Sequence, residues 1–180
     1  MKDEKLDNDT LIARTKHLSL VDRGGWSFVT REGTTGVVCI IAVDNDRRLI
    51  LVEQYRPPVG TSVIELPAGL AGDLADQADE TLEQAARREL LEETGYAAGD
   101  WRQLVTAASS AGITDEVITY FLATNLEKKS PGGGDASEDI RVHEVPLEEV
   151  ESWIDGEMKG GKLVDARVYA GIYFASKYTS

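Results

Sequence analysis

The sequence has a single cysteine, Cys39, and two histidines, His17 and His143. One cysteine excludes a disulfide within the chain, and the apolar run Val37–Ile41 around it is typical of a small buried hydrophobic residue. The two histidines are isolated and, with one cysteine, do not form a zinc ligand set. We therefore expect neither a disulfide scaffold nor a zinc site.

Basic residues are scarce: 19 lysines and arginines stand against 32 acidic residues, for a formal net charge of -13. Such a charge disfavours nonspecific attraction to polymeric nucleic acid and to an anionic membrane surface. A phosphate-bearing ligand would need cations or a few placed arginines to invert the field locally. We expect no polymeric nucleic acid and no membrane among the partners. The negative charge also indicates that a metal ion would accompany a phosphate-bearing ligand.

Long apolar runs are also missing, and none approaches the length of a transmembrane helix. The N-terminus from Met1 to Asp9 is charged and lacks the apolar stretch of a secretory signal, so we expect a cytoplasmic protein. At 180 residues and 42% hydrophobic composition the chain fits one domain with a packed core. There is no internal repeat and no obvious linker.

Short apolar and β-branched segments separated by turn residues predict strands. The first two flank the turn signal Asp22–Gly25 and predict an N-terminal hairpin. Pro67, Gly69 and Gly72 predict a loop that continues to Asp79, and residues 130–135 predict a flexible one. The predicted strands cover residues 18–21, 26–30, 35–43, 49–54, 63–66, 103–107 and 117–123.

A helix over Leu82–Thr94 is predicted, because Thr81 and Gln84 have capping-box spacing and Gly95 can end the helix in the left-handed conformation. Two further helices are expected over residues 147–155 and 166–178. Mixed strands with helices laid on them indicate an α/β fold, an α+β sandwich with a mixed β-sheet between helices.

One stripe of the helix over Leu82–Thr94 begins apolar and ends with three acidic residues, Glu89, Glu92 and Glu93. Neighbouring carboxylates repel one another, and partial burial worsens the repulsion, so they must be protonated, paired or share a cation. Hard divalent ions such as Mg²⁺ bind carboxylate oxygens and bridge substrate phosphates. The alternative is a solvated helix end paired with Arg87 or Arg88.

A longer pattern surrounds this stripe: Gly69, ten residues, Glu80, seven residues, and then Arg-Glu-Leu-Leu-Glu-Glu-Thr-Gly-Tyr from Arg88 to Tyr96. This pattern resembles the Nudix box. The sequence departs from the family at two places, with five extra residues before Glu80 and Tyr96 at a usually aliphatic position. A loop insertion is tolerated energetically, although it leaves the role of Glu80 open.

The resemblance implies a divalent metal bound by Glu89, Glu92, Glu93 and the backbone carbonyl of Ala68, with Mg²⁺ as the expected ion and Mn²⁺ as a substitute. It also implies that Arg88 orients the glutamates rather than touching the substrate.

The segments Val52–Pro58, Glu65–Gly69 and Lys162–Ala166 resemble the branch of the family that hydrolyses ADP-ribose and other nucleoside diphosphate sugars. Within the first of them, Arg56 is the arginine expected on the diphosphate, because its planar fork holds phosphate oxygens well. The alternative for Arg56 is a surface ion pair.

Residues 109–116 are polar, contain a glycine and precede a predicted strand, and they resemble the mobile catalytic loop of the family. Glu116 stands where this branch contacts metal or acts on the attacking water, with Asp115 as a substitute. A carboxylate suits that role because the water must be deprotonated or oriented beside a metal. The alternative is an exposed loop acid.

Trp26 and Phe28 alternate on one predicted strand and could stack on a nucleobase, although core packing or a dimer contact is the favoured interpretation. The resemblance implies an N-terminal tail and hairpin over residues 1–35, serving a homodimer, and a Nudix hydrolase domain over residues 36–180.

The function implied is Mg²⁺-dependent hydrolysis of the diphosphate linkage in a nucleoside diphosphate sugar such as ADP-ribose, which would release a nucleoside monophosphate and a sugar phosphate. Two alternatives stay open. One is hydrolysis of nucleoside triphosphates or dinucleoside polyphosphates with the same box, and the other is a noncatalytic sensor that binds ADP-ribose.

Overall fold

The computed structural model describes residues 9–73, 79–134 and 139–179, and within them the chain forms two sheets and three helices. The smaller sheet is built from β1 (Asp9–Arg14), β2 (Leu18–Arg23) and β3 (Trp26–Arg31). The larger sheet is built from β4 (Gly36–Val43), β5 (Arg48–Arg56), β6 (Thr61–Glu65), β7 (Ala68–Ala71), β8 (Tyr96–Ala108), β9 (Val117–Lys128), β10 (Arg141–Pro146) and β11 (Leu163–Val164). The helices are α1 (Leu82–Thr94), α2 (Val150–Lys159) and α3 (Ala166–Tyr178).

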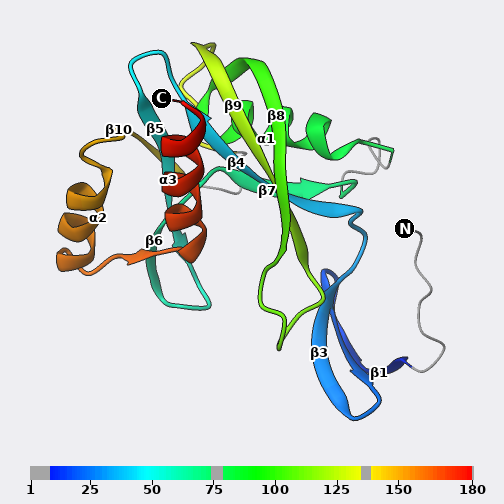
Figure 1. The fold of residues 1–180 in the computed structure, drawn as a ribbon. Helices are drawn as coiled ribbons and strands as arrows, with labels where there is room; N and C mark the ends of the chain where they lie inside the picture. Colours follow the sequence, from blue (N-terminus) through cyan, green and yellow to red (C-terminus); the bar gives the residue numbers. More distant parts are fainter. Residues whose placement is uncertain (1–8, 74–78, 135–138, 180) are drawn as a thin grey trace.

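The larger sheet is mixed, with the strand order β11-β6-β5-β4-β9-β8 (Figure 1). β4 runs parallel to β9 and β6 runs parallel to β11, whereas the other pairings are antiparallel. β10 pairs with β5, and β7 pairs with the first half of β4. The predicted mixed sheet is therefore confirmed.

β4 is buried on both faces, which fixes the layers of the molecule. Val37, Cys39 and Ile41 pack in one cluster with residues of α2 and α3. Val38 and Ile40 point the other way and pack in a second cluster with the apolar residues of α1. The sheet thus lies between α1 and the pair α2 and α3, as the sequence predicts. Burial also raises the pKa of the Cys39 thiol to about 12, so this cysteine stays protonated at neutral pH.

Helix α1 has the predicted bounds and both predicted caps. Gln84 N–H donates to Thr81 Oγ1 at 3.2 Å and Thr81 N–H donates to Gln84 Oε1 at 2.9 Å, which completes a capping box. Gly95 ends the helix with a φ of 73°, the left-handed region. The backbone N–H groups of residues 133 and 134 donate to the carbonyls of Glu93 and Glu92 at 2.8 and 3.0 Å. The acidic end of α1 is therefore held at its backbone.

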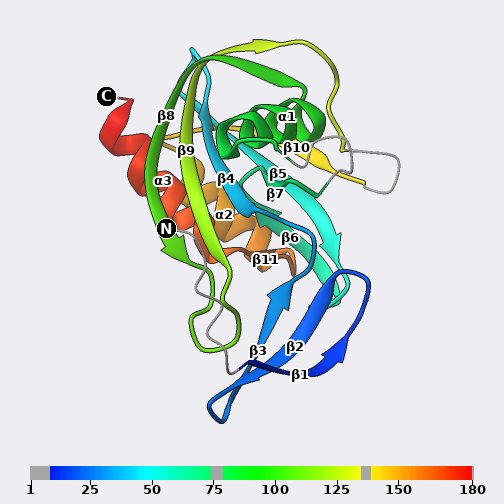
Figure 2. The ribbon, with the colours of Figure 1, turned by 90° about the vertical axis from the view of Figure 1, so that its right-hand side faces the viewer.

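The N-terminal sheet lies apart from the helices and beside the loop that joins β8 to β9 (Figure 2). The predicted hairpin of β2 and β3 is confirmed, with Leu18 opposite Arg31 and Arg23 opposite Trp26. A third strand, β1, was not predicted, because its six residues are all exposed and carry no alternation of buried and exposed positions. The charged tail over residues 1–8 lies outside the described residues.

The predicted loop over residues 67–79 is wrong at its start, where Ala68–Ala71 form β7 against β4. Proline and glycine signal a turn locally but do not show that the chain afterwards pairs with a strand 29 to 35 positions earlier. Residues 74–78 of that predicted loop lie outside the described residues. Residues 130–134 carry no helix or strand, in agreement with the loop predicted there, whose last residue is not described. β8 and β9 extend beyond their predictions, and β10 and β11 were not predicted.

Across the described residues, no helix combines the length and the apolar character that a membrane span requires.

Candidate active site

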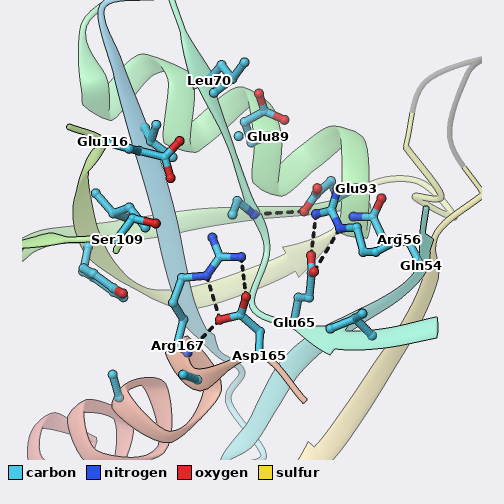
Figure 3. A pocket seen from close by; sticks show the side chains of 18 of the residues that line it. Gln54, Arg56, Glu65, Leu70, Glu89, Glu93, Ser109, Glu116, Asp165 and Arg167 are labelled. Carbon is cyan, nitrogen blue, oxygen red and sulfur yellow. Dashed lines mark hydrogen bonds and ion pairs between the residues drawn. The ribbon is translucent and has the colours of Figure 1, made fainter. Parts of the chain in front are cut away.

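A cavity of about 990 Å³ lies between α1, the ends of β5 and β6, the loop over residues 109–116 and the start of α3 (Figure 3). Its volume is that of a site for a small organic ligand. Its lining is strongly charged, and acidic side chains exceed arginines by three. The acidic ones are Glu65, Asp73, Glu89, Glu92, Glu93, Glu116 and Asp165, and the arginines are Arg31, Arg56, Arg88 and Arg167.

The acidic stripe of α1 forms one wall of this cavity. Glu93 is buried, and its Oε2 accepts a hydrogen bond from the backbone N–H of Ala68 at 3.1 Å. Glu89 is mostly buried, and this burial raises the pKa of its carboxyl to about 7 against the opposing charge of Arg88. Glu92 is exposed and pairs with Arg88. The solvated-end alternative therefore describes Glu92 but not Glu93.

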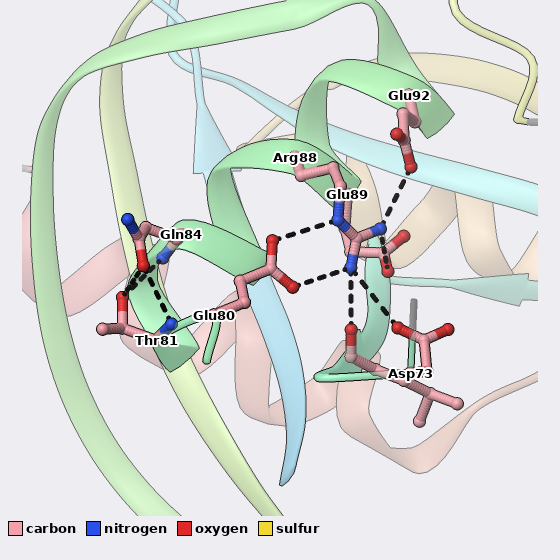
Figure 4. Close-up of polar contacts among 8 residues, drawn as sticks. Asp73, Glu80, Thr81, Gln84, Arg88, Glu89 and Glu92 are labelled. Atoms are coloured by element: carbon pink, nitrogen blue, oxygen red, sulfur yellow. Dashed lines mark hydrogen bonds and ion pairs between the residues drawn. The ribbon is translucent and has the colours of Figure 1, made fainter. Parts of the chain in front are cut away.

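Arg88 is held entirely by neighbouring protein atoms (Figure 4). It donates to both carboxylate oxygens of Glu80 at 3.1 and 3.2 Å, to Glu89 at 2.8 Å and to Glu92 at 3.1 Å. A further bond reaches the carbonyl of Leu70 at 2.8 Å. The contacts agree with the orienting role implied for Arg88. They also show that Glu80 reaches it in spite of the inserted residues.

The backbone of β7 lies unusually close to the acidic wall. A Cβ built on Gly69 would lie 2.0 Å from the carboxyl carbon of Glu89, so a larger residue at this position would push the carboxylate out of the place it occupies. Carboxylate oxygens in a water-accessible pocket with excess negative charge are the donor set that hard divalent cations take. In the described part of the chain no three acidic, histidine or cysteine side chains are already gathered as a ligand cluster. The reason is visible in the contacts, since Arg88 holds Glu89 and Glu92 while Glu93 binds the backbone of Ala68.

Arg56 leaves the end of β5 and pairs with Glu65 of β6. Its Nε donates to Glu65 Oε1 at 2.9 Å, and Nη2 donates to the other carboxylate oxygen. The structure thus combines both interpretations of this residue, because Arg56 makes an ion pair and also lines the cavity.

Glu116 lines the cavity opposite Glu65 and forms an ion pair with Arg31 of β3. Its side chain is 14% exposed, which disagrees with the alternative of an exposed loop acid. Asp115, the substitute considered for the same role, is exposed and lies outside the cavity lining. The loop before Glu116 is attached to β3 by the bond from Val29 N–H to the carbonyl of Ile113 at 2.8 Å.

Trp26 and Phe28, the aromatic pair considered for base stacking, do not line this cavity. Trp26 is 63% exposed and donates through Nε1 to the carbonyl of Gly112 at 3.1 Å. Phe28 is buried, with the guanidinium carbon of Arg23 4.7 Å from the centre of its ring. Within this chain the two side chains serve the contact between the N-terminal sheet and the loop before Glu116, and the core of that sheet.

Sequence reasoning missed Asp165 and Arg167, which line the cavity at the start of α3. Asp165 is the N-cap residue and accepts from the backbone N–H of Arg167 at 2.7 Å. It also accepts from Arg167 Nε at 2.8 Å and Nη2 at 2.7 Å. Aspartate before a predicted helix is a cap signal that could have identified Asp165. No local signal shows that the backbone of this cap pairs with Ile64, about a hundred residues earlier.

Known proteins resemble this chain in sequence and in fold. The model of a family described as NUDIX domain matches residues 33–167. The methanol dehydrogenase activator of Bacillus methanolicus is 33% identical over 140 residues, which cover 77% of this chain and 71% of that protein. The ADP-ribose pyrophosphatase of Mycobacterium tuberculosis is 34% identical over 151 residues, covering 82% of this chain and 69% of that protein. A crystal structure of an ADP compounds hydrolase superposes with a TM-score of 0.67 at 20% identity, covering 98% and 96% of the two chains, and shows the same fold.

Proposed function

The chain belongs to the NUDIX domain family, and from this premise we propose that it hydrolyses the diphosphate linkage of ADP-ribose or another nucleoside diphosphate sugar. The products are a nucleoside monophosphate and a sugar phosphate. One observation carries the proposal: the inward acidic face of α1 and the guanidinium of Arg56 line the same cavity. The name of the mycobacterial relative supports the substrate class.

We assign the binding of Mg²⁺, with Mn²⁺ as a substitute, to Glu89, Glu92, Glu93 and the backbone carbonyl of Ala68. Bound there, divalent ions would offset the excess negative charge of the cavity and polarise the phosphoryl group. Glu89 and Glu92 must exchange N–H donors of Arg88 for the cation. The bonds from Arg88 to Glu80 and to the carbonyl of Leu70 hold the guanidinium in place during that exchange.

The remaining roles follow from the placement of the side chains around the cavity. Arg56 presents a guanidinium already oriented by Glu65 and binds a phosphate oxygen. Glu116 accepts a proton from the attacking water, or orients it, from the side of the cavity opposite Glu65. Arg88 is a positioning residue, because its hydrogen bonds go to the carboxylates and the carbonyl that surround it.

A substrate panel tests the proposal: ADP-ribose, GDP-mannose, UDP-glucose, diadenosine polyphosphates and deoxynucleoside triphosphates, each scored for monophosphate release with Mg²⁺. We expect the highest kcat/KM with a nucleoside diphosphate sugar. Preference for a triphosphate would replace the substrate class, and tight binding of ADP-ribose without any monophosphate release would indicate a sensor. The matched control is Glu93→Gln, which removes an ion ligand with little change of shape and should abolish turnover while the protein stays folded.

We also propose that the N-terminal sheet, the element assigned to residues 1–35, joins two copies of the chain. β1 is an exposed edge strand that carries Leu11 and Ile12, each about half exposed, and such a strand is a template for pairing with another chain. Sedimentation velocity should give a dimer for the native protein and a monomer for the double variant Leu11→Ser with Ile12→Ser. Met158→Ser, which changes an exposed apolar residue of α2, is the control that should stay dimeric.

A further inference from the structure

Two arginine–carboxylate pairs with the same geometry lie on the floor of the cavity. Arg56 holds Glu65 through Nε and Nη2, and Arg167 holds Asp165 through the same two nitrogens. In both pairs one edge of the guanidinium is used and the nitrogen Nη1 makes no bond to the carboxylate. The second pair was not anticipated from the sequence and has no part in the roles assigned above.

The two pairs are neighbours because of the strand register. β11 runs parallel to β6 with Val164 opposite Ile64, so the next residues are Glu65, which ends β6, and Asp165, which follows β11 as the N-cap of α3. The N–H of Asp165 donates to the carbonyl of Ile64 at 2.9 Å and extends this pairing. The backbone of the sheet edge therefore fixes the spacing between the two carboxylates, and each carboxylate fixes the direction of its arginine.

The free edge of Arg167 faces the cavity. Figure 3 shows the remaining terminal nitrogen of Arg167 pointing into the space between Glu116 and Glu65, with no interaction drawn to it. Among the described residues no buried side-chain nitrogen or oxygen lacks a hydrogen-bond partner. Solvent in the cavity therefore reaches this nitrogen, and a ligand in the cavity would reach it too.

Asp165 also holds Arg167 back from the acidic side chains across the cavity, whereas Arg56 lies beside Glu93 (Figure 3). A guanidinium on a flexible side chain would otherwise be drawn to a carboxylate such as Glu116, as Arg88 is drawn to Glu89 and Glu92. Asp165 is well suited to prevent this, since the backbone N–H of Arg167 holds it as an N-cap. Arg167 is thus oriented before a ligand binds, with one edge of its guanidinium hydrogen-bonded to Asp165 and the other edge available to a ligand. Such preorientation reduces the entropy lost on binding.

We propose that Arg167 is a second anion-binding arginine, which donates from Nη1 to a phosphate oxygen of the bound diphosphate beside Arg56. The identity of the ligand as a nucleoside diphosphate rests on the proposed function, whereas the capacity to bind a diphosphate group does not. The planar guanidinium can serve a carboxylate on one edge and a phosphate on the other. Lysine offers a point charge and cannot bridge the two in this way.

The test measures binding of inorganic pyrophosphate by calorimetry at saturating Mg²⁺, together with kcat and KM for the best substrate of the panel. Arg167→Lys keeps the charge and loses the fork. The double variant Asp165→Asn with Arg167→Gln removes both charges at once, keeps the N-cap and leaves no unpaired carboxylate. The matched control is Arg23→Lys, because Arg23 makes the same two-bond pair with Asp9 outside the cavity.

Both Arg167 variants should bind pyrophosphate roughly 10- to 100-fold more weakly than the native protein, the loss expected for a charge-assisted hydrogen bond. KM should rise in step, and Arg23→Lys should behave as the native protein. Native-like pyrophosphate binding by the folded double variant would show that Arg167 merely supports the helix start, and it would overturn the inference. Failure of the native protein to bind pyrophosphate would overturn the inference as well.

The inference and the proposed function can fail separately. If the native protein binds pyrophosphate and the Arg167 variants do not, yet no nucleotide of the panel is hydrolysed, the anion site stands and the assigned reaction falls. If a nucleoside diphosphate sugar is hydrolysed equally well by the native protein and the double variant, the reaction stands and the role of Arg167 falls.

Discussion

The indole Nε1 of Trp26 donates to the carbonyl of Gly112 at 3.1 Å and joins two residues 86 positions apart. With the bond from Val29 N–H to the carbonyl of Ile113, it attaches β3 to the loop before Glu116 at two points, and the ion pair of Arg31 attaches β3 to Glu116 itself. The N-terminal sheet therefore positions a carboxylate of the candidate active site within the same chain.

Trp26→Phe should lower kcat several-fold and leave KM nearly unchanged, because the substitution keeps an aromatic ring and removes the donor that holds the loop. A single neutral hydrogen bond contributes about 1 kcal/mol, so unfolding by urea should shift only slightly. Steady-state kinetics beside urea titration separates the two effects. A rise in KM alone would instead favour a role of Trp26 in binding the substrate.

Gly69→Ala should reduce activity at least about tenfold and raise the Mg²⁺ concentration needed for half-maximal rate, since the new Cβ displaces the carboxylate of Glu89. The control is Gly156→Ala in α2, where a Cβ would meet no atom within 4 Å and φ is not positive. That change should leave the rate unaltered and stabilise the fold by about 0.5–1 kcal/mol. Equal Mg²⁺ dependence of both variants would contradict the close approach of β7 to a metal ligand.

Glu80→Gln should lower the rate and the affinity for Mg²⁺ by roughly 10- to 100-fold. Losses of this size follow when a residue that orients the metal-binding side chains is removed. The amide has one acceptor oxygen and no charge, so it cannot bind Arg88 through two oxygens as the carboxylate of Glu80 does. The remaining bonds of Arg88 go to the glutamates of α1 and to Leu70. Glu83→Gln is the control, because Glu83 forms the equivalent surface pair with Arg87. An unchanged rate for Glu80→Gln would mean that, with the inserted residues present, Glu80 is not needed to orient Arg88.

Glu53→Gln should lower stability near neutral pH, by about 1 kcal/mol after allowance for solvent screening. Burial opposes ionisation of Glu53, but bonds from Lys162 and His143, both at 2.9 Å, lower its pKa below the ordinary 4.5. A lowered pKa in the folded state gives stability that is present above pH 4.5 and is lost as the pH falls through the folded-state value.

Urea unfolding of the native protein and this variant at pH 7 and near pH 3 checks the sign. The difference between them should shrink at the lower pH, and a difference that grows on acidification would refute the assigned pairing. Glu127→Gln, which removes an exposed partner of Lys129, should change stability by less than about 0.5 kcal/mol at either pH.

The sequence predicted α1 to the residue because every signal for it is local. Thr81 and Gln84 close the capping box within a single helical turn, and Gly95 ends the helix within its own backbone. The apolar run of β4 likewise predicted a strand in the core of a sheet, and the structure buries both of its faces. Local chemistry and burial pattern thus sufficed for the central strand and for the acidic wall.

The rest of the cavity depends on pairings between distant segments. β7 and β11 are short strands that exist because β4 and β6 are there to pair with them. Arg31, Asp165 and Arg167 reach the cavity through tertiary contacts. The sequence within a few residues of each one contains no signal that predicts this position. The placement of Glu116 came from resemblance to a family, since a loop carboxylate by itself is indistinguishable from an exposed one.

The parallel pairing of β4 with β9 joins Val37 to Ile118 and Ala42 to Ala123. A contact between segments so far apart must first overcome the entropy of closing a long loop, and folds dominated by such contacts form slowly. During synthesis α1 and its caps can form early, yet β11 and Arg167 come last among the elements around the cavity. A chain still attached to the ribosome would therefore expose the acidic wall of α1 before Asp165 and Arg167 are in place, and the cavity would be completed as one of the final events of folding.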